Sequence, residues 1–226
     1  RKNAVWSEEW SHYNEAIIAR LDTDLDHVDK LVSYESPPEV VAGKEANIIF
    51  KAGSLQGDKY WVCTQTEILL YEYPSFRLIK RHSLPCFNDL HHVAEINGSI
   101  YVVSTGLDMI VKLDENLNVS SCQNALGDPV WGRFDKDTDY RKVLTTKPHQ
   151  AHPNYIFEIN GDIWATRFEQ RDAVNLNNMK QTIDIGTERV HDGIIRGDYI
   201  YFTTVNGTVV VVNKTTCKVE ARFDLN

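Results

Sequence analysis

The chain has 226 residues, of which 42% are hydrophobic and 25% charged, a composition typical of a globular protein with a buried core. Its net charge of −8, without a run of Lys or Arg, argues against a nucleic-acid partner. No apolar run approaches the ~20 residues of a membrane helix, so we expect no membrane partner and a cytoplasmic location. The four cysteines form no CxxC pair, which favours free or buried thiols over a zinc site or a disulfide framework: Cys63, Cys86, Cys122 and Cys217.

The first 45 residues follow no clear repeat. The segment from Glu8 to Arg20 is compatible with a short helix or with two strands, and Asp26 to Tyr34 has the pattern of an outer strand. We expect residues 1–45 to form an N-terminal blade, or a segment that closes a ring with the last strand of the chain.

From residue 46 onward, a strand–turn–strand pattern recurs four times. Each copy has an apolar strand, a tight turn and a strand rich in aromatic and β-branched residues, which is the sequence form of a β-hairpin. The four turns contain glycine next to Asn or Asp: Gly57-Asp58, Asn97-Gly98, Asn160-Gly161 and Gly197-Asp198.

A short third strand and then a fourth follow each hairpin. Examples of the third strand are Ile68–Tyr71 and Val209–Val212, and an example of the fourth is Val219–Phe223. Four antiparallel strands per repeat predict an all-β fold, a β-propeller in one domain of residues 1–226, with five blades rather than six. The clear blades are predicted at residues 46–87, 88–148, 149–187 and 188–226. A sandwich of the same strands, or an open fragment of a larger propeller, is the alternative.

The second repeat is lengthened by a polar insertion from Asp128 to Lys147, which carries Trp131 and Arg133. We expect this insertion to lie as a loop over one face of the propeller.

The repeat that contains His91 to Leu113 reads HHVAEINGSIYVVSTGLDMIVKL. It resembles the repeat of NHL-type and SMP-30/gluconolactonase-like propellers, and the chain from His91 to Asn213 also resembles an uncharacterised bacterial family of such propellers. The resemblance extends to the repeats at Asn154 and His191 and is absent before residue 45. It implies a propeller fold, but this superfamily includes enzymes, binding modules and scaffolds.

Histidines gather at the start of the predicted innermost strands. When the repeats are aligned on their turns, equivalent residues fall into three sets: His91, Asn154 and His191; Asp89, His152 and Arg189, two positions earlier; and His92, Tyr155 and Asp192, on the opposite face of the strand. The innermost strands of a propeller surround its channel, so we expect these side chains to meet at one channel mouth. A shift of the alignment by one residue would exchange the two faces.

Imidazole and carboxylate groups are ligands for Zn²⁺, Fe²⁺ and Mn²⁺. We therefore expect a divalent metal held by His91, His152, His191 and Asp89, with Zn or Fe favoured over Ca because Ca²⁺ prefers oxygen ligands. The family resemblance implies a divalent metal in a similar place. The alternative is that these residues bond only to backbone groups and water.

The remaining candidates complete an enzyme hypothesis. His92, Asp192 and Arg167 are the candidate catalytic residues, and the candidate substrate-binding residues are His149, Asn154, Tyr155 and Arg189. Together they predict a metal-dependent lyase or hydrolase for a small polar substrate, in which an unligated His or Asp moves the proton. The alternative is a non-catalytic propeller that binds a protein or glycan partner through the loop that carries Trp131.

Overall fold

The chain is built almost wholly from β-strands. The computed structural model describes residues 13–22, 24, 27–43, 47–186 and 188–225. Within these residues, helical structure is confined to three 3₁₀ turns, at Pro38–Val40, Thr105–Leu107 and Tyr140–Lys142. None of the described residues forms a helix with the length and apolar character that crossing a membrane requires.

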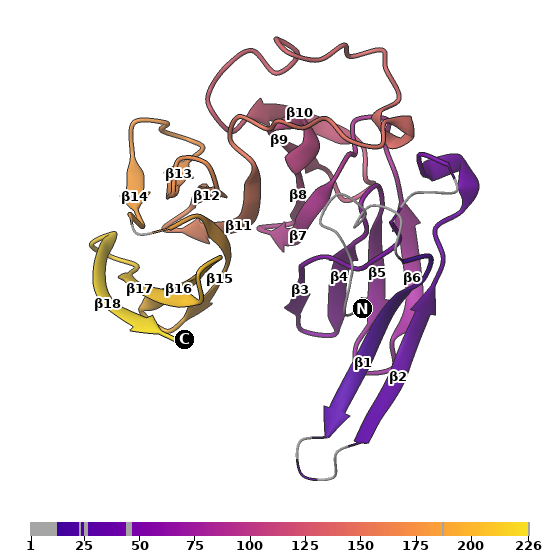
Figure 1. Ribbon diagram of the computed structural model, residues 1–226, viewed down its shortest axis with the longest axis horizontal. Helices are drawn as coiled ribbons and strands as arrows, with labels where there is room; N and C mark the ends of the chain where they lie inside the picture. The colour runs from indigo at the N-terminus through magenta and orange to yellow at the C-terminus, as the bar shows by residue number, and fades with distance from the viewer. Residues whose placement is uncertain (1–12, 23, 25–26, 44–46, 187, 226) are drawn as a thin grey trace.

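Sixteen strands form four antiparallel sheets of four strands each, which we number as blades 1 to 4 in chain order (Figure 1). Blade 1 contains β3 (Gly53–Gln56), β4 (Lys59–Cys63), β5 (Ile68–Glu72) and β6 (Arg77–His82); blade 2 contains β7 (Leu90–Ile96), β8 (Ser99–Ser104), β9 (Met109–Leu113) and β10 (Val119–Asn124). Blade 3 contains β11 (Pro153–Ile159), β12 (Asp162–Arg167), β13 (Asp172–Asn175) and β14 (Thr182–Asp184); blade 4 contains β15 (Val190–Arg196), β16 (Tyr199–Thr204), β17 (Thr208–Asn213) and β18 (Lys218–Asp224). The prediction of four-stranded antiparallel blades is confirmed.

The tight turns have the backbone conformation that the sequence predicts. Asn97 and Gly98 have φ of 51° and 75°, and Asn160 and Gly161 have φ of 54° and 88°. Positive φ at both central residues matches the right-handed twist of the paired strands and explains the choice of Asn and Gly.

The prediction of a fifth blade is wrong for the residues that the structure describes. Strands β1 (Ala16–Asp22) and β2 (His27–Tyr34) pair only with each other, as a two-stranded hairpin beside blade 1. The outer strand expected at Asp26–Tyr34 corresponds to β2, and the second half of the Glu8–Arg20 segment forms β1 rather than a helix. Residues 1–12 lie outside the described residues.

Both faces of the blades are apolar because successive blades stack face to face. Alternate residues of β8 point to opposite faces: Ile100 and Val102 pack between blades 1 and 2, whereas Val103 packs between blades 2 and 3. A third apolar cluster, which includes Phe157 and Phe202, joins blades 3 and 4. The innermost strands of blades 2, 3 and 4 each contact the innermost strand of the blade before them.

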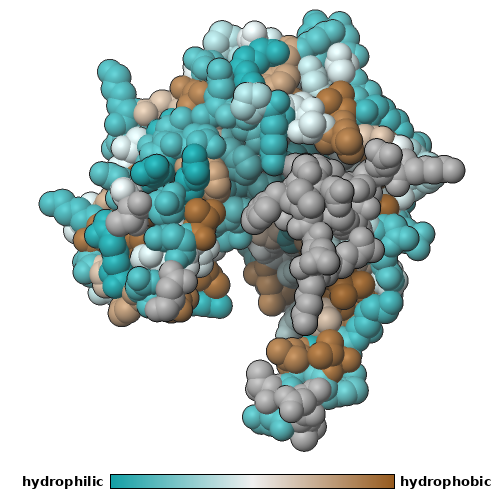
Figure 2. All heavy atoms as spheres, viewed as in Figure 1, coloured by the Kyte–Doolittle hydropathy of each residue, from teal (hydrophilic) through white to brown (hydrophobic). Residues whose placement is uncertain are grey.

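The blades follow an open arc (Figure 1). Figure 2 shows the molecule hollowed between blade 4, at lower left, and hairpin β1–β2, at lower right. The four innermost strands, β3, β7, β11 and β15, line a channel cavity of about 650 Å³. This open arrangement gives the channel a side opening.

Hairpin β1–β2 covers the outer face of blade 1. Val32 packs with Val62, Leu69 and Tyr71, and the Tyr34 hydroxyl donates a hydrogen bond of 2.8 Å to Glu67. The Glu67 side chain is fully buried, with Arg81 Nε 3.6 Å from its carboxylate. Burial raises the pKa of Glu67, although Ser36, Tyr34 and Arg81 oppose the shift.

This buried acid predicts a pH dependence of stability. A carboxyl group whose pKa is raised by folding binds a proton more readily in the folded state, so its contribution to the free energy of unfolding is largest at low pH. That contribution falls as pH rises from about 4.3, the usual pKa of a free Glu, through the raised pKa of Glu67. We expect Glu67→Gln to flatten this part of the profile, measured by urea unfolding between pH 4 and 8. Equal slopes in the two proteins would contradict the prediction.

Candidate active site

The candidate site lies at the mouth of the channel, where three innermost strands share one irregularity. The pairing register shifts between Leu90 and His92 in β7, between Pro153 and Ile156 in β11, and between Val190 and Gly193 in β15. A β-bulge of this kind inserts an extra residue and redirects side chains. The bulges contain His91-His92, Asn154-Tyr155 and His191-Asp192, the residues that the repeat alignment placed at equivalent positions.

Polar side chains from blades 2, 3 and 4 meet at this mouth. The His91 ring lies 5.0 Å from the His152 ring and 5.4 Å from the His191 ring, measured between centroids. His91 Nδ1 is hydrogen-bonded to Asn154 Oδ1, and Asn154 Nδ2 donates to the Val190 carbonyl at 3.3 Å. Asn154 therefore links the mouth residues of three consecutive blades.

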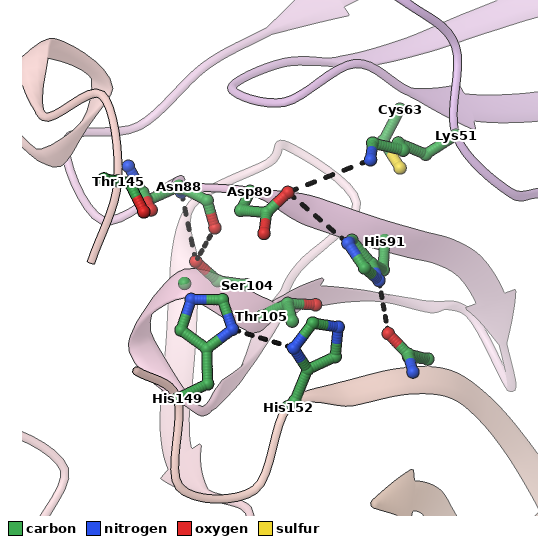
Figure 3. A network of polar contacts seen from close by, with 12 residues as sticks. Lys51, Cys63, Asn88, Asp89, His91, Ser104, Thr105, Thr145, His149 and His152 are labelled. Carbon is green, nitrogen blue, oxygen red and sulfur yellow. Dashed lines mark hydrogen bonds and ion pairs between the residues drawn. The ribbon is translucent and has the colours of Figure 1, made fainter. Parts of the chain in front are cut away.

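Blade 1 contributes Lys51, which sequence reasoning missed. Its Nζ lies 3.9 Å from Asp89 Oδ1, and His91 Nε2 lies 3.4 Å from the same oxygen (Figure 3). A signal for Lys51 was present, because it precedes its turn by the same interval that separates His91, Asn154 and His191 from theirs. The complete ring at this position is thus Lys51, His91, Asn154 and His191.

Asp89 provides the buried negative charge at the mouth. Burial disfavours its ionised form, but His91 and Lys51 outweigh that effect and hold the pKa of Asp89 below its usual value. Asp89 and His152 both have positive φ, 47° and 51°. This left-handed backbone breaks the alternation of a strand and turns both side chains toward the mouth.

His149 and His152 form a pair on the turn that leads into β11. Their Nδ1 atoms are 2.8 Å apart (Figure 3). His149 Nε2 also lies 3.3 Å from Thr146 Oγ1. Burial lowers the pKa of His149, and burial together with His91 and His149 lowers that of His152 strongly. Both rings are therefore neutral near pH 7, the form in which imidazole accepts a proton or binds a metal.

A second cavity, of about 550 Å³, opens beside this pair. Lys147, Pro148, His149, His152, Phe168 and Glu169 line it. The Phe168 ring lies 4.7 Å from the His152 ring, and the Arg189 guanidinium stacks over Phe168 at 5.5 Å. Arg189, a predicted substrate-binding residue, thus lies beside the mouth, and its guanidinium also lies 3.6 Å from Glu169.

His92, Tyr155 and Asp192 line the channel cavity instead. His92 is buried, its ring lies 4.9 Å from the Tyr155 ring, and its Nδ1 accepts a hydrogen bond of 3.3 Å from the Ile156 amide. Burial lowers the pKa of His92 to about 4, although a hydrogen bond to the Gly53 backbone opposes the shift. His92 therefore connects β3, β7 and β11 through backbone groups.

Asp192 accepts a hydrogen bond of 3.0 Å from His191 Nδ1, which makes the two a dyad that reaches from the mouth into the channel. Burial disfavours its ionised form, but His191 outweighs this and lowers the pKa of Asp192.

Two sequence candidates lie in other settings. Arg167 forms a two-point ion pair with Asp172, with distances of 2.8 and 2.6 Å. Within the described residues, no hydrogen bond or ion pair joins Arg167 to the histidines of the mouth. Trp131 of the insertion packs against the apolar cluster of blades 1 and 2.

Asp108, a further residue that sequence reasoning missed, anchors the histidine turn. Its buried carboxylate accepts hydrogen bonds from the amides of Gln150, Ala151 and His152, at 2.9, 2.8 and 2.8 Å. Arg133 of the insertion donates a fourth, at 2.6 Å.

Comparison with known proteins identifies the architecture. No protein-family model and no curated protein matches the chain. Among solved structures, a streptogramin B lyase has a TM-score of 0.53 and 18% identity over 78% of this chain, and virginiamycin B lyase from Staphylococcus aureus has a TM-score of 0.56 and 12% identity over 96%. A protein of unknown function from Bacteroides caccae has a TM-score of 0.57 and 9% identity, with 96% of this chain and 71% of that chain covered.

The fold is that of a β-propeller. At these identities the likeness shows the fold alone, and it does not distinguish the NHL and SMP-30 families from other propellers. The chain spans 54% and 64% of the lengths of the two lyases.

The position of His92 generates a stability prediction. Replacing it with Ala removes a buried ring and leaves the Ile156 amide without its acceptor, so we expect a loss of about 2–4 kcal/mol in the free energy of unfolding. Urea unfolding of His92→Ala measures this loss, with exposed His27→Ala as the control. A loss no larger than about 0.5 kcal/mol, the usual range for surface substitutions, would contradict the role of His92 between the blades.

Proposed function

We propose that the chain forms the active-site part of a propeller enzyme, a lyase or hydrolase that acts on a small polar substrate at the channel mouth. The observation that supports this most is the meeting of His91, His152 and His191, from three blades, beside a buried carboxylate and an open cavity. The lyases among the structural neighbours agree with the reaction class.

Proton transfer is the chemistry that this arrangement supports. His191 is oriented by Asp192, and His152 by His149, so two imidazoles with fixed directions face the same space. One neutral imidazole removes a proton from the substrate or from water, and a second group returns one to the leaving group. Lys51 and Arg189 supply positive charge near the bond that breaks, where they stabilise a developing oxyanion.

A divalent metal remains part of the proposal. The imidazoles of His91, His152 and His191 and the carboxylate of Asp89 are suitable donors for Zn²⁺ or Fe²⁺, and the buried Asp89 Oδ1 lies 3.4 Å from His91 Nε2. Within the described residues, no three His, Cys, Asp or Glu side chains have their donor atoms grouped for a metal ion. Binding therefore requires ring rotation. A bound metal would polarise a substrate carbonyl or activate water.

Activity measurements test the role of the mouth histidines. Lactones, esters and quinupristin, the ligand named for one lyase neighbour, serve as probes, and product mass separates elimination from hydrolysis, which adds one water. For any substrate turned over, we expect His152→Ala and His191→Ala to lower kcat/KM by about 10²–10⁴, the usual contribution of a general acid or base. His82→Ala, in β6, is the control.

Full turnover by both variants would contradict the proposal. So would a lack of turnover of every probe combined with saturable binding of a glycan or a protein, which would favour the binding-module alternative.

Metal binding is tested separately by titrating metal-free protein with Zn²⁺ in a calorimeter. We expect one site, and an affinity at least about tenfold weaker in His91→Ala, because each ligand contributes strongly to a site of this kind. The His82→Ala variant is again the control. Unchanged affinity in His91→Ala, or no binding by the parent protein, would remove the metal from the proposed mechanism.

A further inference from the structure

We infer that Asp108 and Arg133 are positioning residues, which hold the His149–His152 turn in the geometry that the mouth requires. The inference rests on the proposed function for its purpose, but the contacts that carry it do not involve a substrate. It assigns a role to the insertion at residues 128–147, which the repeat pattern alone leaves unexplained.

Local backbone hydrogen bonds fix the position of Asp108, independently of its contacts with the histidine turn. It follows the 3₁₀ turn Thr105–Leu107 with φ of 52°, and its amide donates to the Thr105 carbonyl at 3.0 Å. Its carbonyl accepts from the Ala125 amide at 2.8 Å. The carboxylate is 1% exposed, so it points inward from a fixed point between β8 and β9.

The carboxylate of Asp108 binds three consecutive amides of the turn. Oδ1 accepts from Ala151 and His152, and Oδ2 accepts from Gln150. A buried carboxylate needs this number of donors, because an uncompensated buried charge is strongly unfavourable. The same bonds fix the direction of the chain from which the two histidine side chains extend.

Arg133 holds the same turn from the other side. Its Nη1 donates to Asp108 Oδ2 at 2.6 Å and its Nη2 to the Pro148 carbonyl at 2.9 Å. The guanidinium also lies over the Phe134 ring at 5.0 Å, and Phe134 packs against the apolar cluster of blades 1 and 2. Asp108 and Arg133 together therefore bind residues 148, 150, 151 and 152.

The backbone conformation of His152 explains why the turn needs these contacts. Its φ of 51° is uncommon for a residue with a side chain and persists where the surroundings impose it. The amide of His152 is one of the three that Asp108 binds. Loss of the contacts that Asp108 and Arg133 make with the turn is therefore expected to make the His149–His152 pair mobile while the blades stay folded.

Chemical modification of individual histidines tests this role without a substrate. Wild type, Arg133→Ala, Arg133→Lys and Asp108→Asn are treated with diethyl pyrocarbonate, and the modification rate of each histidine is followed by mass spectrometry. The matched control is Arg141→Ala, which removes another arginine of the insertion, one paired with Asp139 at 2.8 Å. Thermal unfolding of each variant confirms that it is folded.

In Arg133→Ala we expect His149 and His152 to react about tenfold faster relative to His82, the effect of losing a charge-assisted hydrogen bond. Arg133→Lys should restore part of the protection, because an ammonium group pairs with Asp108 but does not bridge to Pro148 in the same way. Arg141→Ala should match the wild type.

Unchanged relative rates in a folded Arg133→Ala protein would overturn the inference, and so would an equal increase at all histidines. If Asp108→Asn does not fold, the Arg133 variants decide alone. Since no turnover is measured, results that contradict the proposed function would leave this result standing.

Discussion

The mouth of the propeller depends on one extra residue at the start of three innermost strands. A regular strand sends alternate side chains to opposite faces, so neighbouring residues diverge. The bulges at His91, at Asn154-Tyr155 and at His191-Asp192 relax this constraint and supply both the mouth and the channel with polar groups. In blades 3 and 4 the amide at the bulge faces a threonine hydroxyl, Thr166 at 2.9 Å and Thr203 at 3.4 Å, which compensates for the lost pairing.

The sequence predicts the blades well because two local signals agree. Turns such as Asn97-Gly98 need positive φ, and the strands around them alternate between two apolar faces. These local signals do not determine the number of blades, which depends on which strands join the same sheet and stack on the next one. Hairpin β1–β2 shows the difficulty: Ile17, Leu21 and Val28 are exposed, so its pattern differs from that of a strand inside a blade.

Some residues of the candidate site can likewise be predicted from the repeat, and others cannot. Its ring of Lys51, His91, Asn154 and His191 follows from the repeat, because equivalent positions of successive blades face one channel. The roles of Asp108 and Arg133 cannot be predicted from the repeat. Their partners lie in the histidine turn, about forty residues after Asp108 and about fifteen after Arg133, and only the folded chain brings them together. The separation of His92 from the mouth likewise depends on the register of β7, because a shift of the repeat alignment by one residue would exchange the two faces.

The contact between His149 and His152 has a consequence for protonation. A hydrogen bond between two Nδ1 atoms 2.8 Å apart contains one hydrogen, so one ring donates through Nδ1–H, and the other accepts at an unprotonated Nδ1 and carries its hydrogen on Nε2. Two imidazolium rings cannot face each other in this way, because both nitrogens would then be donors. The turn therefore holds at most one positive charge while the pair is intact, and the two rings titrate as a single unit rather than as two histidines.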